Sequence, residues 1–332
     1  MASYDVYGLG NALLDIECEV TPETLSQLGI DKGVMTLLDE TAQNNILAHL
    51  SGQTTKRSSG GSAANTLIGV SQFGGKAYYS CKVADDESGQ FYLQDLVDCG
   101  VETNLQKQPL GDGITGKCLV LVTPDADRTM NTFLGISATL AETELDGGAI
   151  ANSTYTYIEG YLVTGESGKA AAIKARELAQ AAGQKVALTL ADLNMVKFFK
   201  AGLLEMIGDG LDLLFANESE ALEMAGTEDF ETAFEYLKTL AKTFAITRGP
   251  AGSVMFDGEN RIEIAGVPVK AVDTVGAGDM YAGAVLYGIT NGLGWETAGK
   301  LGSAASAKLV TSLGARLQTE QSQAVLAQVL AG

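Results

Sequence analysis

Apolar residues in this chain alternate between short continuous runs and helical spacings, and this alternation predicts an α/β fold. In the second half of the chain, the short runs predict strands at residues 154–163, 185–190, 211–216 and 243–247. Apolar positions three and four residues apart predict the intervening helices, at residues 168–182, 196–207, 218–225 and 230–240. Such alternation indicates a parallel sheet with helices on both faces, where ligands bind beyond the carboxyl ends of the strands.

The first half of the chain is less regular, but the same patterns predict strands and helices there. Strands are expected at residues 4–9 and 76–83, and helices at 41–50, 63–73 and 89–99. Residues 117–123 and 128–134 predict a β-hairpin. Short strands are expected around Gly258, and the last helices at residues 278–290, 296–311 and 319–330. Neither a repeat nor a linker divides the sequence, so we expect one domain over residues 1–332.

Composition and charge narrow the classes of partner. The 332 residues are 46% hydrophobic and carry a formal net charge of −19, so nucleic acid and anionic membranes are poor partners. The amino-terminal residues lack a basic, apolar signal sequence, and no apolar run is long enough to span a bilayer. The four cysteines form no C-x-x-C pair, which favours reduced thiols in a cytoplasmic protein.

Three features resemble functional motifs but fit them poorly. Residues 165–170 resemble a P-loop, yet alanine follows Lys169 where a Mg²⁺-binding hydroxyl is required. Residues 111–116 match G-x-G-x-x-G but precede a predicted strand instead of a helix, which argues against a dinucleotide site. His49, the only histidine, lies in a predicted helix, so Ser-His-Asp catalysis has little support.

The strongest chemical signal is a glycine-rich turn that leads directly into a helix of small residues. Gly276, Ala277 and Gly278 precede Asp279, and the unpaired N–H groups of such a turn would form a site for a phosphoryl group. A carboxylate beside an anion site suits a general base that accepts a proton from an attacking hydroxyl. The alternative is an acidic helix cap.

Two motifs together resemble those of the ribokinase family, also called the PfkB carbohydrate kinases. One is residues 273–279, and the other is residues 60–65. The resemblance extends over residues 4–316 and implies a three-layer fold with a mainly parallel central sheet. It also implies a small β-rich lid, formed approximately by residues 10–40 and 100–137.

The resemblance further implies roles for individual residues. Asp279 would be the catalytic base, and Gly276, Ala277 and Gly278 would form the anion hole. Substrate hydroxyls would be held by Gly60, Gly61 and Asn65, although a plain helix-entry turn would also explain the glycines. ATP would be bound by Asn194, Asn217, Thr247, Arg248, Gly249 and Gly252.

Two cation sites are also implied by the resemblance. Asn217 and Glu220 match an N-x-x-E motif in which Glu220 would hold Mg²⁺ through water, whereas the alternative is a helix cap. Asp273, with Gly314 in a later loop, would serve a monovalent cation such as K⁺.

The segment at residues 8–16 resembles the adenosine kinase branch of the family, in which Asn11 and Asp15 would hold the ribose hydroxyls. Arg128 would approach the phosphates or close the site. Walls for a nucleobase are less evident, and the candidates are Phe133, Leu134 and Ile136.

We therefore expect an ATP- and Mg²⁺-dependent kinase of the 5′-hydroxyl of adenosine or a related nucleoside, which would act in purine salvage. A ribokinase-like kinase of a free sugar is the alternative, and a catalytically silent nucleotide-binding protein is more remote. The sequence leaves open whether the protein forms a homodimer.

Overall fold

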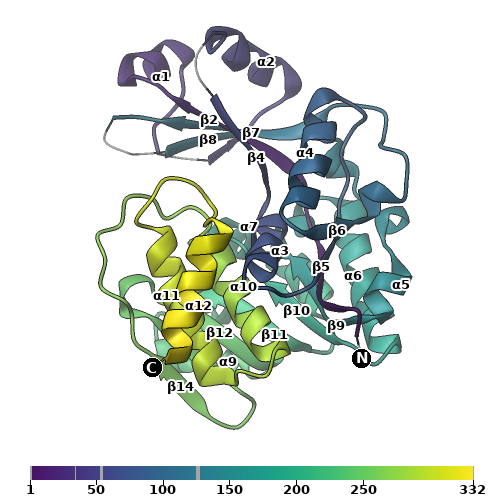
Figure 1. The fold of residues 1–332 in the computed structure, drawn as a ribbon, viewed down its shortest axis with the longest axis vertical. Coiled ribbons are helices and arrows are strands. Elements are labelled where there is room, and N and C mark those ends of the chain that lie inside the picture. The colour runs from purple at the N-terminus through teal and green to yellow at the C-terminus, as the bar shows by residue number, and fades with distance from the viewer. Residues whose placement is uncertain (1, 34, 53–54, 125–127, 332) are drawn as a thin grey trace.

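The computed structural model describes residues 2–33, 35–52, 55–124 and 128–331, which form a large α/β unit and a smaller β-rich unit above it (Figure 1). The strands of the larger sheet follow the order β14-β13-β12-β11-β10-β9-β1-β5-β6. Their bounds are β1 (Tyr4–Leu9), β5 (Ala77–Ser80), β6 (Val101–Thr103), β9 (Ser153–Glu159), β10 (Lys185–Thr189), β11 (Leu211–Asn217), β12 (Ala241–Thr247), β13 (Ser253–Phe256) and β14 (Arg261–Ile264). All neighbouring pairs from β6 to β12 are parallel, and β13 and β14 add an antiparallel edge.

Helices cover both faces of this sheet. The helices of the large unit are α3 (Ser62–Gln72), α4 (Glu87–Asp98), α5 (Gly147–Ala151), α6 (Glu166–Ala181), α7 (Leu193–Ile207), α8 (Glu218–Ala225), α9 (Phe230–Leu237), α10 (Ala277–Thr290), α11 (Trp295–Leu309) and α12 (Thr319–Ala331). Leu214 of β11 packs in a core with residues of α6 to α9, whereas its neighbour Leu213 packs in a second core with residues of α3, α4 and α10. This alternation along one strand confirms the three-layer, mainly parallel fold.

The smaller sheet has the order β3-β8-β7-β2-β4, and two helices cover one of its faces. Its elements are β2 (Leu13–Glu19), α1 (Pro22–Leu28), β3 (Met35–Leu37), α2 (Glu40–His49), β4 (Thr55–Gly60), β7 (Thr115–Val122) and β8 (Arg128–Gly135). The amino-terminal contribution thus continues past residue 40 to Gly60, and β6 within residues 100–114 belongs to the larger sheet. The antiparallel pairing of β7 with β8 agrees with the predicted hairpin.

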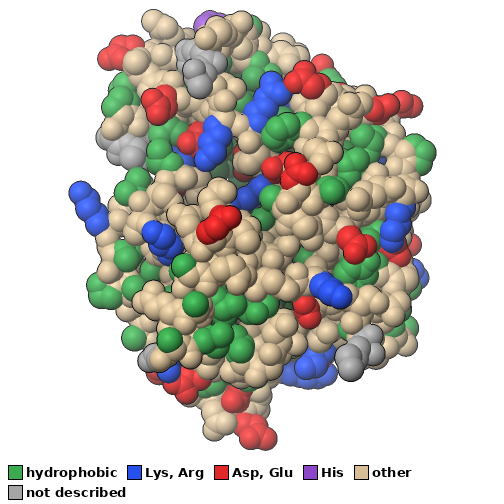
Figure 2. Space-filling model, viewed as in Figure 1, with side chains coloured by type: hydrophobic (Ala, Val, Ile, Leu, Met, Phe, Trp, Pro, Cys, Tyr) green, Lys and Arg blue, Asp and Glu red, His purple; other side chains and the backbone are tan. Residues whose placement is uncertain are grey.

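The two faces of the smaller sheet differ in character. Leu14 and Ile16 of β2 pack with residues of α1 and α2. Asp15 and Glu17 alternate with them along β2 and point to the opposite face, which looks towards the large unit and which we call the site face. Its central residues are Asp15, Glu17, Cys118, Val120 and Met130, which are paired across β2, β7 and β8. On the face shown in Figure 2, Lys and Arg side chains lie along the hollow between the two units.

The features that resembled other motifs have structural roles. Helix α6 begins at Glu166, and Lys169 pairs with Glu205 at 3.0 Å instead of forming a phosphate loop. His49 is exposed at the end of α2, and its Nδ1 lies 2.8 Å from the carbonyl of Asn45.

One predicted strand was too long, because the chain turns into a 3₁₀ helix at Gly160–Thr164 after Glu159. In the described part of the chain, no helix is both long enough and apolar enough to cross a membrane.

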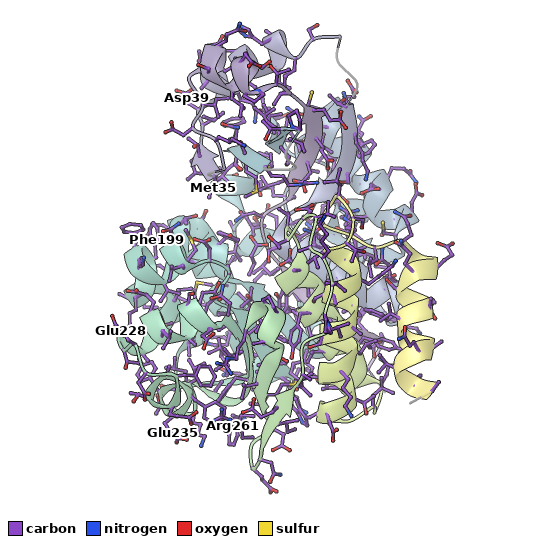
Figure 3. The ribbon with its side chains drawn as sticks, turned by 90° about the vertical axis from the view of Figure 1, so that its left-hand side faces the viewer. Met35, Asp39, Phe199, Glu228, Glu235 and Arg261 are labelled. Atoms are coloured by element: carbon purple, nitrogen blue, oxygen red, sulfur yellow. The ribbon has the colours of Figure 1, made fainter. Side chains whose placement is uncertain are left out.

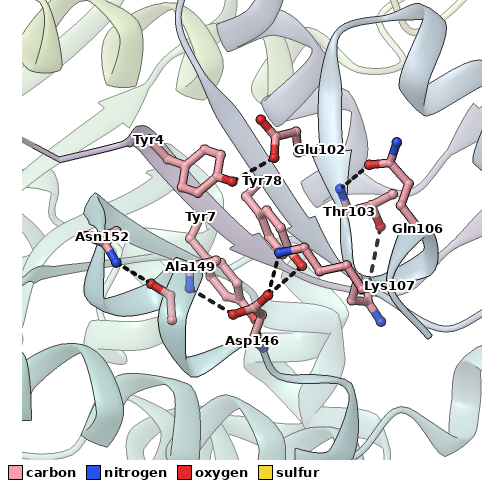
Figure 4. Close-up of polar contacts among 12 residues, drawn as sticks. Tyr4, Tyr7, Tyr78, Glu102, Thr103, Gln106, Lys107, Asp146, Ala149 and Asn152 are labelled. Carbon is pink, nitrogen blue, oxygen red and sulfur yellow. Dashed lines mark hydrogen bonds and ion pairs between the residues drawn. The ribbon is translucent and has the colours of Figure 1, made fainter.

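A cluster of polar side chains connects the amino ends of β1 and β5 (Figure 4). These ends lie at the edge of the sheet opposite the one where the strands have their carboxyl ends. Tyr4 donates to Glu102 at 2.7 Å, and Tyr78 donates to Asp146 at 2.9 Å. Lys107 pairs with the same oxygen of Asp146 at 2.8 Å and lies over the Tyr78 ring. Because these polar and charged groups are bonded to one another, we assign the cluster to fold stability.

Candidate active site

The candidate site lies at the carboxyl ends of the parallel strands, under the site face of the smaller sheet. Strand order reverses direction at β1, because β5 follows on one side and β9 on the other. Such a switch point is where ligands bind in open α/β sheets. Glu159 ends β9 there, and Asn11 follows β1. Further along the same edge, Asn217 ends β11 in register with Thr247 of β12.

Two helix N-termini meet at this edge, and Asp279 lies between them. Helices α3 and α10 pack closely where Gly69 faces Gly283, so their first turns are near each other. Asp279, in the first turn of α10, accepts a hydrogen bond from Ser62 Oγ at 2.6 Å and one from Asn65 Nδ2 at 3.3 Å. The two sequence motifs, more than 200 residues apart, therefore meet at a single carboxyl group.

Asp279 has an environment suited to proton transfer. Burial disfavours its charged form and raises the pKa to about 6, against the opposing effect of the hydrogen bonds from Ser62 and Asn65. A carboxyl with this pKa is mostly ionised at neutral pH and is more basic than an ordinary aspartate. Asp279 lies in the helix without capping it, since α10 has no side-chain cap.

The turn before α10 is shaped by glycine and left open. Gly276 has φ +75°, and a Cβ there would also lie 2.8 Å from Ala315 Cα, so any other residue would be strained. Since no side chain caps α10, N–H groups of its first turn are available to an anion. Ala277 N instead donates to Thr274 O at 3.2 Å, and open space surrounds Gly278. Gly278 and Asp279 are therefore better placed than Ala277 to donate to a ligand.

Glu159 is a buried carboxylate that the sequence analysis did not identify. It accepts hydrogen bonds from the backbone N–H of Asn11 at 3.3 Å, from Asn11 Nδ2 at 3.3 Å and from the N–H of Ala63 at 2.8 Å. Burial raises the pKa of Glu159 to about 7. Glu159 thereby fixes the loop after β1 and the first turn of α3. The signal for it was a single acidic residue at the end of an otherwise uncharged strand.

Asp15 and the glycine pair form the substrate side of the site. Asp15 lies within β2, so it does not end a strand, and its carboxyl group contacts Gly60 so closely that a Cβ there would collide with it. Gly61 has φ +101°, and a Cβ would collide with the carbonyl oxygen of Asn11. Burial raises the pKa of Asp15 to about 7, and the charge of Arg316 opposes this rise. The glycines are thus required by neighbouring protein groups.

Arg128 and Asp273, predicted to serve the substrate and a cation respectively, are paired with each other. Arg128 Nη2 lies 2.9 Å from Asp273 Oδ2 and 3.4 Å from Glu17 Oε2. Asp273 also accepts from the N–H of Gly314 at 2.8 Å and from the N–H of Val275 at 3.1 Å. The guanidinium therefore already supplies positive charge to the carboxylate that would bind a monovalent cation, and this arrangement does not fit an additional K⁺.

Asn217 and Glu220 form a reciprocal helix cap at the start of α8. Glu220 accepts from Asn217 N at 2.9 Å and from Asn217 Nδ2 at 2.7 Å, and its own N–H donates to Asn217 Oδ1 at 2.8 Å. Burial raises the pKa of Glu220 to about 7, and the nearby Asp192 adds to the rise. The described residues contain no cluster of three or more potential metal ligands. Glu220, whose pKa is influenced by the charge of Asp192, is therefore a candidate to hold Mg²⁺ only through water.

The remaining predicted ATP residues lie on neighbouring loops. Arg248 is held by Glu218, with Nη2 3.1 Å from Oε1, and it stacks on the Phe230 ring at 4.5 Å. Thr247 ends β12, Gly249 and Gly252 bound the following 3₁₀ turn, and Asn194 is exposed in the first turn of α7.

Comparison with known proteins agrees with this arrangement. The sequence pattern of the pfkB family carbohydrate kinases matches residues 36–322. The solved structure of adenosine kinase from Sinorhizobium meliloti is 36% identical, with a TM-score of 0.87 and 100% of each chain covered. That of a probable sugar kinase from Rhizobium etli is 34% identical, with a TM-score of 0.89, and covers 99% of this chain and 100% of the other.

A curated relative carries a different substrate name. The 5-dehydro-2-deoxygluconokinase of Clostridium perfringens is 27% identical over 264 residues, which is 76% of this chain and 78% of the relative. The names of these relatives leave the substrate class open between nucleosides and sugars. The family pattern, together with solved structures that match over the whole chain, shows a ribokinase-like phosphotransferase of sugar or nucleoside hydroxyl groups. The chain is therefore a member of the pfkB family of carbohydrate kinases.

Proposed function

We propose that this protein uses ATP and Mg²⁺ to phosphorylate the 5′-hydroxyl of adenosine or a closely related nucleoside. The observation that carries the nucleoside assignment is the composition of the site face. Asp15 lies opposite Cys118, and Glu17 lies opposite Val120, which lies opposite Met130 in turn. A carboxylate suited to a vicinal diol thus adjoins an apolar surface suited to a base.

The apolar surface continues to the edge of the smaller sheet. Met35 and Leu37 of β3 pair with Met130 and Thr132, and they are 43% and 58% exposed. Across the gap, α7 presents Phe199 towards the same side of the molecule (Figure 3). Phe133, one candidate wall, alternates to the helix-covered face of β8, whereas Leu134 lies on the site face. A free sugar would leave this apolar surface in water.

The residues suggest an in-line transfer. Asp279 accepts the proton of the 5′-hydroxyl while the hydroxyl oxygen forms a bond to the γ-phosphorus. The bond from that phosphorus to the bridging oxygen of ADP breaks at the same time. The N–H groups of the α10 first turn stabilise charge on the transferred phosphoryl group. Mg²⁺, when bound, would neutralise phosphate charge, with Glu220 and Asp192 holding its water ligands. Asp15 and Asn11 hold and orient the ribose.

The substrate is tested by measuring ADP release with adenosine, guanosine, inosine, ribose and fructose. We expect kcat/KM to be highest for adenosine and at least about tenfold lower for free ribose, because ribose lacks the base. Asp15→Asn should reduce kcat/KM for nucleosides. A free sugar that outperforms every nucleoside would establish the sugar kinase alternative, which the name of the Clostridium perfringens relative favours. Calorimetric nucleoside binding without any ADP release would instead indicate a silent binding protein.

A further inference from the structure

Arg316 occupies a central position in the site that neither of the two motifs indicates. It lies in the loop between α11 and α12, and its side chain is 13% exposed. Nη1 is 3.0 Å from Asp95 Oδ2 of α4, and Nη2 donates to Ser59 Oγ of β4 at 2.8 Å. Nε donates to Asn65 Oδ1 of α3 at 3.2 Å. One guanidinium thus joins the smaller sheet to two helices of the large unit.

The bond to Asn65 fixes which way its amide points. A guanidinium has only donors, so the group that Nε meets must be the amide oxygen. The amide nitrogen then faces the opposite way, and it lies 3.3 Å from Asp279 Oδ2. Asn65 can therefore donate to the candidate base only in the orientation that Arg316 imposes. Asp95 holds Arg316 in turn, and it also accepts hydrogen bonds from Ser59 N and Oγ.

The same loop touches the anion hole. Gly314 N donates to Asp273 at 2.8 Å, and Ala315 contacts Gly276, the residue that precedes α10. The loop of residues 314–316 therefore contacts both the turn that would bind the phosphoryl group and, through Asn65, the carboxyl that would accept the proton.

We propose that Arg316 is a positioning residue that orients the Asn65 amide towards Asp279 and so sets the alignment and basicity of the base. This inference rests on the proposed role of Asp279 as base. Arg316 itself does not touch the reacting atoms. Its partners Ser59, Asn65 and Asp95 come from β4, α3 and α4, so it acts only when the smaller sheet and the large unit are packed together.

The charged groups around Asp279 determine how this role would appear in a pH profile. Its carboxyl interacts unfavourably with the carboxylates of Asp15 and Glu159, whereas Ser62 and Asn65 donate to it. Loss of a donor to a carboxylate raises its pKa. If Asn65 turned away, the acidic limb of kcat would therefore move to higher pH, and kcat at neutral pH would fall.

The test is a double-mutant cycle of Arg316→Met and Asn65→Ala, with kcat measured from pH 5 to 9. We expect each single variant to lower kcat about 10- to 100-fold and to move the acidic limb to higher pH. The double variant should be no slower than the slower single variant, because both changes remove one interaction. Arg316→Lys should recover little, since an ammonium lacks the planar fork of donors. Arg57→Met, at an exposed pair with Glu87, is the matched control.

Two results would overturn this inference. One is an acidic limb that stays in place in Arg316→Met, and the other is a double variant whose losses multiply. Circular dichroism verifies folding, and Asp95→Asn provides the same test if Arg316→Met does not fold. Asp279→Asn is assayed in parallel. High activity in that variant would refute the base assignment itself, whereas an inactive Asp279→Asn beside a normal Arg316→Met would refute only the positioning role.

Discussion

At the scale of single residues, Asp279 combines two demands that usually conflict. A base must attract a proton, whereas a carboxylate near phosphate groups must not repel them. Burial makes the carboxyl more basic, with a pKa of about 6, and the donors Ser62 and Asn65 keep it ionised near neutrality. The first turn of α10 supplies N–H groups on the side where the phosphoryl group would lie.

Asp279→Asn should therefore lower kcat by about 10²- to 10⁴-fold, because an amide cannot accept the proton. The amide is nearly the same size and can still bond to Ser62, so ATP affinity should change little. Steady-state kinetics and calorimetric titration with ATP measure the two quantities. A kcat within a factor of three of the wild type would contradict the assignment.

The raised pKa of Asp279 also predicts the pH dependence of the wild-type enzyme. The base acts when deprotonated, so kcat should be half-maximal near pH 6 and level from about pH 7 to 8. A kcat profile over pH 4.5–8.5 in constant ionic strength tests this expectation. An acidic limb near pH 4, the ordinary range of aspartate, would show that Asp279 is not buried as described.

The sequence predicted some site residues and missed others for a physical reason. Gly276 to Asp279 are adjacent in sequence, so their roles can be predicted from the local sequence without knowledge of the fold. Glu159 and Arg316 acquire their roles only by contacting residues 96 or more positions away, such as Ala63 and Asn65. No local pattern encodes such contacts, and the pairing of Arg128 with Asp273 escaped prediction for the same reason.

At the scale of elements, helix α3 begins directly after Gly61 and positions Ser62 and Asn65 beside Asp279. Gly61→Ala should destabilise the protein by about 1–3 kcal/mol or more, because φ is +101° and the added Cβ would strike the carbonyl of Asn11. Gly147→Ala is the control, since that glycine starts α5 with open space around it. Urea denaturation of both variants measures the free energies of unfolding. Equal stability of the two variants would contradict the strained turn.

The link between β8 and the turn before α10 predicts the response to monovalent cations. Arg128 already neutralises Asp273, so replacing K⁺ by tetramethylammonium in Na⁺-free buffer should change wild-type kcat less than about twofold. Arg128→Met leaves the Asp273 carboxylate without this partner, and it should lower activity and create K⁺ activation. Initial rates at matched ionic strength test both expectations. Strong K⁺ activation of the wild type would restore the cation site expected from the family resemblance.

Sequence patterns predicted the elements of the large unit better than those of the smaller sheet. Strands β10, β11 and β12 each contain an apolar run of three or four residues, because helices cover both of their faces. Strand β4, in contrast, is largely polar and exposed at the edge of the smaller sheet, and β3 has only three residues. Neither strand has an alternation of apolar and polar residues long enough to detect in the sequence. The full extent of this sheet is therefore evident only from the pairing of its strands in the structure.

At the scale of the whole molecule, the site contains several buried carboxyl groups in a protein whose net charge is already strongly negative. The net charge is −19, and the carboxyls of Asp15, Glu159 and Glu220 all have pKa values raised to about 7, chiefly by burial. Each value lies above that of the unfolded chain, so proton binding favours the folded state. The stability linked to these groups is fully present below about pH 4 and is lost progressively as pH rises from there to about 7. Substrate hydroxyls and metal-bound water would offset this cost by donating to the carboxylates.

Asp15→Asn should consequently raise Tm at pH 8 while weakening the use of nucleosides, which is the trade-off expected of a residue kept for function. The amide removes the cost of a buried charge, and the gain should shrink towards pH 5, where the wild-type carboxyl is mostly protonated in the fold. Thermal unfolding of both proteins from pH 5 to 8 measures the difference, with the exposed Asp31→Asn as control. If Asp15→Asn lowered Tm equally at every pH, the carboxylate would be a structural partner. The acidic concentration at this site would then need an explanation other than substrate binding.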